Sequence, residues 1–171
     1  MRKRFILLTV LGFTALCAHA QPLNVRKELG EILKATQQAL KSGDFSGALS
    51  DLAVADTITD KTPEEETVVE QMRVIAALNA RQPDIAANSF QRLNDIGRLS
   101  PLNKLQFSQG IAAGYVNAGN MPGAIAWAAY NVQSGGTNAG IQQLAAQAPP
   151  AAPAAGQPAY ALPPGVVPPS R

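Results

Sequence analysis

The chain has 171 residues with 14 basic and 12 acidic side chains, and its hydrophobic fraction of 46% suffices for one folded domain. Its single cysteine and single histidine, Cys17 and His19, both lie in the first 20 residues. Once that segment is removed, the chain can form neither a disulfide, nor a Cys/His zinc site, nor a nucleophile paired with histidine. We therefore expect a protein that is not an enzyme and uses no cofactor.

Residues 1–20 have the pattern of a secretory signal peptide. A basic start at residues 2–4 precedes an apolar run at 5–17, and the A-x-A motif at 18–20 provides a cleavage site. The apolar run has 13 residues, which is short of the roughly 20 that a transmembrane helix needs. Cleavage after Ala20 leaves eleven basic and twelve acidic residues, a net charge of −1 that argues against nucleic-acid binding. We expect a periplasmic or secreted protein with no stable membrane insertion after cleavage.

The apolar spacing between residues 23 and 147 is helical almost throughout and predicts a single all-α domain. No stretch alternates with a period of two for long enough to form a strand. Thr62, Pro63 and Glu65 predict a capping box at the start of the third helix, and Gly97 is a C′ candidate after the fourth. In chain order, the predicted helices cover about residues 29–40, 46–58, 63–80, 85–96, 101–116 and 123–133.

The composition changes abruptly at Pro149. Residues 149–171 contain 8 of the 13 prolines and almost no large aliphatic side chains. Such a segment cannot bury a core of its own. We therefore expect residues 148–171 to form a disordered tail with polyproline II character.

The six predicted helices form three hairpins that share a spacing of 38 residues. The small residue Ala48 recurs as Ala86 and Ala124, and Leu52 and Phe90 lie four residues later in the first two copies. Two helices of a hairpin approach closely only where one of them offers a small side chain. The predicted repeats cover about residues 24–61, 62–99 and 100–137.

This pattern resembles the tetratricopeptide-repeat family, whose unit is a helix-turn-helix of about 34 residues. The small positions of that unit match Ala112 on a first helix and the three alanines on the second helices. Phe90 and Tyr115 match its aromatic and tyrosine positions, and the chain is similar to exported repeat proteins of Gram-negative bacteria. The resemblance implies a right-handed α-solenoid of about three helical hairpins that binds a protein or a peptide. The residues expected to pack the repeats are Ala48, Leu52, Ala86, Phe90, Ala112, Tyr115 and Ala124.

Charged residues are unevenly distributed along the predicted domain. The acids between residues 51 and 70 lack the spacing of a calcium loop, so we expect a helix cap and a solvated face instead. Two interpretations of the basic residues stay open: they stack without repulsion, or they form a patch that steers an acidic partner. These basic residues are Arg73, Arg81, Arg92, Arg98 and Lys104.

No charged residue occurs from residue 105 to residue 170. A repeat array needs a terminal repeat with a polar outer face, and the sixth predicted helix lacks one. Three explanations stay open: a partner or second copy covers it, the tail and residues 137–147 fold back on it, or uncharged Gln and Asn side chains cap it. We expect one side of this helix to be exposed, with Trp127, Tyr130 and Ile125 as candidate partner-binding residues. A homodimer through the third repeat is one form of such a contact. For Trp127, plain packing between the fifth and sixth predicted helices stays open as the alternative.

Together these features predict a non-catalytic periplasmic protein-protein interaction module that serves cell-envelope assembly or transport. The alternative is a structural envelope protein tethered through its proline-rich tail, with the repeats as a spacer. Binding of a protein or peptide is the first expectation because repeat arrays expose extended surfaces to their partners.

Overall fold

Seven helices make up the described part of the chain, residues 25–148 of a computed structural model. No strand occurs in this range, so the prediction of an all-α fold is confirmed there. The predicted signal peptide and the segment from Pro149 onward lie outside the described residues. In chain order, the helices are α1 (Lys27–Ser42), α2 (Phe45–Asp56), α3 (Pro63–Asn79), α4 (Pro83–Asp95), α5 (Pro101–Asn117), α6 (Met121–Gln133) and α7 (Ala139–Ala145).

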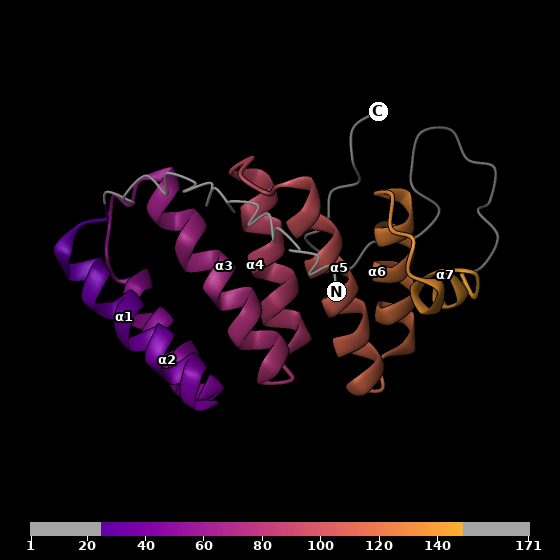
Figure 1. Cartoon of the computed structure of the whole chain (residues 1–171), viewed down its shortest axis with the longest axis horizontal. Coiled ribbons are helices and arrows are strands. Elements are labelled where there is room, and N and C mark those ends of the chain that lie inside the picture. The colour runs from indigo at the N-terminus through magenta and orange to yellow at the C-terminus, as the bar shows by residue number, and fades with distance from the viewer. Residues whose placement is uncertain (1–24, 149–171) are drawn as a thin grey trace, which may run out of the picture.

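The helices form three hairpins that lie side by side in a row (Figure 1). Helix α1 pairs with α2, α3 with α4, and α5 with α6, while α7 packs on α6 at the far end. Neighbouring hairpins contact each other through α2 and α3 and through α4 and α5. This packing of consecutive helices is compatible with a helical repeat.

The turn inside each hairpin has the same backbone structure and recurs every 38 residues. One residue in the turn adopts a left-handed conformation, and the N–H group of the next residue donates to a carbonyl five residues earlier. This arrangement satisfies a carbonyl at the end of the first helix, and the donor residue is also the N-cap of the second helix. The left-handed residues are Gly43 (φ 79°), Arg81 (φ 59°) and Gly119 (φ 73°), and the donors are Asp44, Gln82 and Asn120.

The predicted start of α3 and the predicted end of α4 are confirmed, whereas the start of α4 differs from the prediction. The predicted capping box of α3 is confirmed: Thr62 Oγ1 accepts from the Glu65 N–H at 3.2 Å, and Glu65 Oε2 accepts from the Thr62 N–H at 2.9 Å. Gly97 has a φ of 72° just after the C-cap of α4, as predicted. Helix α4 begins at Pro83, two residues before the predicted start at residue 85, because the first turn of a helix needs no N–H donor.

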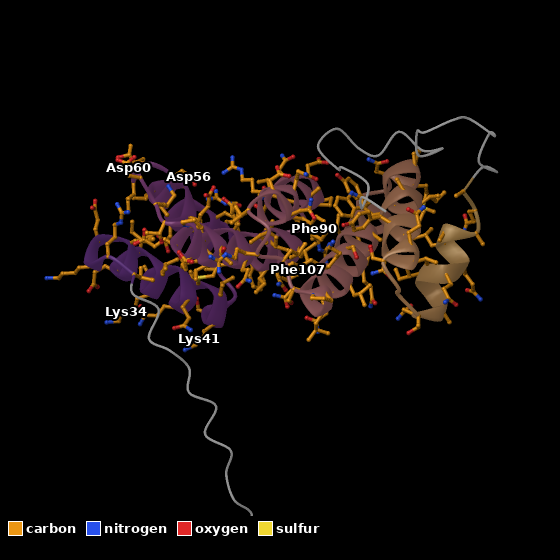
Figure 2. All side chains as sticks on the ribbon, turned by 90° about the horizontal axis from the view of Figure 1, so that it is seen from above. Lys34, Lys41, Asp56, Asp60, Phe90 and Phe107 are labelled. Carbon is orange, nitrogen blue, oxygen red and sulfur yellow. The ribbon has the colours of Figure 1, made fainter. Side chains whose placement is uncertain are left out.

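Two clusters of buried side chains hold the hairpins together. One cluster joins α1, α2 and α3 around Leu29 and Val69, and the other extends from α3 to α7 around Trp127. Phe90 and Phe107 lie near the middle of the molecule in Figure 2. The seven residues expected to pack the repeats are all buried, with at most 4% of each exposed: Ala48, Leu52, Ala86, Phe90, Ala112, Tyr115 and Ala124.

Small and large side chains set the spacing between the second and third hairpins. A Cβ atom added to Gly110 on α5 would lie 2.8 Å from Leu78 Cδ1, so glycine permits the close approach of α5 to α3. Helices α4 and α6 are instead separated by the rings of Phe90 and Trp127, whose centroids are 5.0 Å apart. Helices α3 and α5, the first helices of these two hairpins, therefore contact each other directly, and their outer faces lie next to each other.

Candidate functional site

The structure buries two of the three candidate partner-binding residues. Trp127 is 1% exposed and Tyr130 is 2% exposed, while Ile125 is half-buried. The ring of Phe90 contacts both aromatic rings edge to face, with centroid distances of 5.0 and 5.6 Å. The expectation that Trp127 and Tyr130 lie on an exposed side of α6 is therefore wrong. Whether a partner binds these three residues stays a prediction.

A further helix, α7, packs on α6 at this end of the row, and the sequence analysis did not identify it. Ile141 is 8% exposed and belongs to the same buried cluster as Trp127, with Leu144 packed against it. Asn138 starts the helix, because its Oδ1 accepts from the Ile141 N–H at 3.1 Å. An asparagine followed by two apolar residues three positions apart is the available sequence signal, and it is too short to establish a helical period.

Helix α7 presents glutamine side chains to solvent at this end of the row. Gln142 and Gln143 on α7 and Gln147 just after it are exposed, whereas Ile141 is buried. Of the features named in the three explanations for the uncharged end, the described residues show that the segment after α6 packs back on it and exposes uncharged polar side chains. The tail named in the second explanation lies outside the described residues, and all three explanations stay predictions. An apolar α6 is compatible with water because α5 and α7 pack against it.

Two acidic residues of the run between 51 and 70 are buried: Glu65, which belongs to the capping box as predicted, and Glu70, which was expected on a solvated face. Glu65 is 2% exposed and Glu70 is 1% exposed. Arg26 holds Glu65 with its backbone N–H at 2.9 Å and its Nη2 at 3.0 Å. Hydrogen bonds from Arg26 and from the Thr62 N–H lower the pKa of Glu65 from 4.5 to about 2.

Glu70 forms two ion pairs, one with α4 and one within α3. Its Oε1 lies 3.2 Å from Arg92 Nη1 on α4, and its Oε2 lies 3.3 Å from Arg73 Nε on α3 itself. Arg73 also pairs with Asp56 on α2 at 2.6 Å. The acids and bases of the first two hairpins therefore join neighbouring helices, which agrees with the interpretation that they stack without repulsion.

An uncharged surface covers the outer faces of α5 and the adjoining part of α3. Leu102 is 63% exposed and Val116 is 41% exposed on α5, and Ile75 is 43% exposed on α3. Ile75 and Ala113 occupy the same position of the 38-residue repeat, and both are exposed on neighbouring helices. We call this the α3–α5 face, and its exposed residues are Ile75, Asn79, Leu102, Gln106, Gln109, Ala113, Val116 and Asn117.

A second feature is a recess of about 420 Å³ between the turns of the second and third hairpins. The hydroxyl of Tyr115 donates to Asp84 Oδ1 at 2.7 Å in its wall. Burial, with this carboxylate as a second cause, raises the pKa of the Tyr115 hydroxyl, so it remains a hydrogen-bond donor. The recess is lined by Arg81, Gln82, Pro83, Asp84, Ile85, Tyr115, Ala118 and Asn120.

The described range contains no cluster of three or more His, Cys, Asp or Glu residues able to hold a metal ion. Within the same range, no helix has both the length and the apolar character needed to cross a membrane.

Comparisons with known proteins do not assign the chain to a family. No family model matches it, and neither a curated protein nor a solved structure shows significant similarity to it.

Proposed function

We propose that the protein is an exported, non-catalytic interaction module built as a right-handed tetratricopeptide-like solenoid. It binds a segment of a partner protein on the α3–α5 face, and it serves cell-envelope assembly or transport. The exposed α3–α5 face is the observation that carries this proposal. It gathers three of the five large exposed hydrophobic residues among residues 25–148, which are Val54, Ile75, Leu102, Val116 and Met121.

The chemistry of the face indicates which kind of segment it accepts. Leu102, Ile75 and Val116 provide apolar contact area, and Gln106 and Gln109 lie exposed between them on the surface. A glutamine amide both donates and accepts hydrogen bonds, so it can satisfy the backbone of an extended peptide. No charged residue lies among the exposed residues of this face. The expected partner segment is therefore uncharged, with apolar side chains that alternate with solvent-facing ones.

Compartment enters the proposal through the sequence of residues 1–20, which has the organisation of a signal peptide. In the envelope, a module without catalytic groups acts by bringing proteins together. The alternative role is a spacer tethered through residues 149–171. In that role the tail contacts the partner, whereas in the proposed module the α3–α5 face does.

Cross-linking in periplasm followed by mass spectrometry tests the proposal. The chain from Gln21 onward is compared with the variant Leu102→Asp/Val116→Asp, which places two charges on the α3–α5 face. The matched control is Val54→Asp, because Val54 is 54% exposed on α2 and lies outside this face. We expect one set of cross-linked proteins to be lost with the double variant and kept with the control.

Deletion of residues 149–171 distinguishes the interaction module from the tethered spacer. The interaction module keeps its cross-linked partner after this deletion, whereas a tethered spacer loses it. Cross-links that survive Leu102→Asp/Val116→Asp but disappear with the tail would overturn the proposed function.

A further inference from the structure

The recess between the second and third hairpins contains an arginine without an ion pair. Four of the five arginines among residues 25–148, namely Arg26, Arg73, Arg92 and Arg98, form ion pairs with acidic side chains. Arg81 forms none with the residues that the structure describes. Its side chain is exposed, and it lines the recess. A guanidinium is charged at every physiological pH, so this charge is available to a ligand.

The backbone at this position makes arginine an unexpected residue. Arg81 has a φ of 59°, and the equivalent positions of the other two hairpins are occupied by Gly43 and Gly119. Glycine adopts this conformation freely, whereas a residue with a Cβ atom is disfavoured there. Glycine would therefore fit this turn with less backbone strain. The arginine at position 81 adds a charged side chain that glycine lacks.

We propose that this recess binds the carboxylate of an aspartate or glutamate side chain from a partner protein, with the Arg81 guanidinium as its principal contact. The planar guanidinium can donate two parallel hydrogen bonds to one carboxylate. The proposal rests on the proposed function, because it names one chemical group of the partner that the module recognises.

The other walls of the recess define the environment of that acidic residue. Asn120 Oδ1 already accepts from the Gly123 N–H at 3.0 Å, which leaves the amide nitrogen of Asn120 to donate. Pro83 and Ile85 supply apolar contact for the methylene groups of the ligand side chain. The recess therefore suits an acidic side chain better than an inorganic anion, because only the side chain has methylene groups to contact Pro83 and Ile85.

Asp84 limits how much negative charge the recess accepts. Its carboxylate accepts the Tyr115 hydroxyl at 2.7 Å, and it lies in the same wall as Arg81. A second acidic residue next to the first would meet this carboxylate and be repelled, whereas a backbone N–H of the partner could donate to it. The recess therefore favours a single acidic residue flanked by uncharged residues over an acidic run.

Two peptide mixtures test the proposal directly. Both consist of acetylated and amidated hexapeptides with uncharged random positions, and they differ only in one fixed central residue, glutamate or glutamine. They are passed over the immobilised chain from Gln21 onward, and the retained fractions are measured at low and high salt. We expect about tenfold greater retention of the glutamate mixture, as for one charge-assisted pair, and a smaller preference at high salt.

Arg81→Gly is the informative variant because it restores the residue found in the other two turns. It should melt at the same or a higher temperature than the native chain and should lose the preference for glutamate. Arg98→Gln is the matched control: it removes another half-exposed arginine, which pairs with Glu64 away from the recess, and it should keep the preference.

Equal retention of the two mixtures by the native chain would overturn the proposal. A glutamate preference that persists in Arg81→Gly would also overturn it. Retention of both mixtures that depends on Leu102 and Val116 but not on Arg81 would leave the proposed function intact and reject only this site.

Discussion

At the residue scale, the described domain is joined by polar contacts of two kinds. In the first two hairpins, the buried carboxylates of Glu65 and Glu70 face arginines from neighbouring segments. In the third hairpin, the buried amide of Asn131 donates to the Leu105 carbonyl and to Ser108 Oγ, both at 2.8 Å. Burying a charge is unfavourable unless it is paired, so the loss of one partner of an ion pair is costly.

Replacing Arg26 by glutamine tests the ion pair with Glu65. The variant leaves a buried carboxylate with fewer donors, and we expect the free energy of unfolding at pH 7 to fall by about 1–3 kcal/mol. Urea unfolding monitored by circular dichroism measures this change. Arg98→Gln serves as the control, because Arg98 and Glu64 are each 52% exposed and such pairs contribute less than about 1 kcal/mol. Equal losses in the two variants would contradict the assignment.

The same ion pair predicts how stability depends on pH. The pKa of Glu65 is lowered from 4.5 to about 2 in the folded chain, so its contribution is complete above pH 4.5. That contribution is lost as the pH falls from 4.5 toward 2. Urea titrations at several pH values should show a shallower loss in Arg26→Gln than in the native chain. Parallel curves for the two proteins would show that Arg26 does not lower this pKa.

A substitution at Ala86 tests the close contact between α3 and α4. Ala86 is fully buried, so Ala86→Leu should overpack the second hairpin and lower the free energy of unfolding by about 1–3 kcal/mol. Ala80 is half-buried at the C-cap of α3, and Ala80→Leu should be tolerated better. Thermal melts of the two variants provide the measurement, and identical melting temperatures would count against the 38-residue alignment.

At the element scale, the two ends of the row of helices in residues 25–148 differ in how their outer faces meet solvent. Helix α1 places Glu31, Lys34 and Gln38 at positions where α3 has the less exposed Val69, Met72 and Ala76. Its outer side is therefore polar, as a terminal element requires. The other end depends on α7, a helix of 7 residues that is too short to be stable without its contacts to α6.

Replacing Ile141 by aspartate should detach α7 from α6. The charged side chain cannot remain in the buried cluster, so Trp127 and Tyr130 become accessible to water. We expect a red shift of the Trp127 fluorescence and binding of a hydrophobic dye, with a smaller change in total helix content. Gln143→Asp is the matched control, because Gln143 is exposed on the same helix. Unchanged fluorescence in Ile141→Asp would mean that α7 does not cover α6 in solution.

At the scale of the whole molecule, charge is concentrated in one part of the chain. The labelled charged residues Lys34, Lys41, Asp56 and Asp60 in Figure 2 all lie toward the α1–α2 end. Residues 105–148 carry no charge at all. The ion pairs therefore lie in the first two hairpins, and from residue 105 to residue 148 the chain offers only uncharged side chains for contact.

Export is a prediction about the whole chain. We expect the secreted form to begin at Gln21, because the motif at residues 18–20 directs cleavage there. Intact-mass measurement of the protein recovered from periplasm checks this expectation. Retention of residues 1–20, or an acyl adduct on Cys17, would contradict it.

Self-association through the third hairpin also stays a prediction. We expect sedimentation to show association of residues 21–171, and the same or stronger association of residues 21–148. Ile125→Asp should weaken it, because Ile125 is half-buried on α6. Strictly monomeric behaviour of both chains would exclude such a homodimer.

The sequence by itself determined those features whose causes lie within a few residues. The helices, the capping box of Thr62 and Glu65, and the left-handed Gly97 follow from apolar spacing and from hydrogen bonds three to five residues apart. The 38-residue spacing of Ala48, Ala86 and Ala124 could be read in the same way, because a repeat is visible as a pattern along the chain.

Only the tertiary structure decided which distant groups meet. Arg26 and Glu65 are 39 residues apart, and no local pattern distinguishes a carboxylate that will be buried against an arginine from one that faces water. The same holds for α7, whose short sequence is helical because α6 offers it an apolar surface. It also holds for Trp127 and Tyr130, which are buried in one cluster with Phe90 of α4 and Ile141 of α7. Burial depends on the sum of all contacts around a side chain, and that sum exists only after the hairpins have packed.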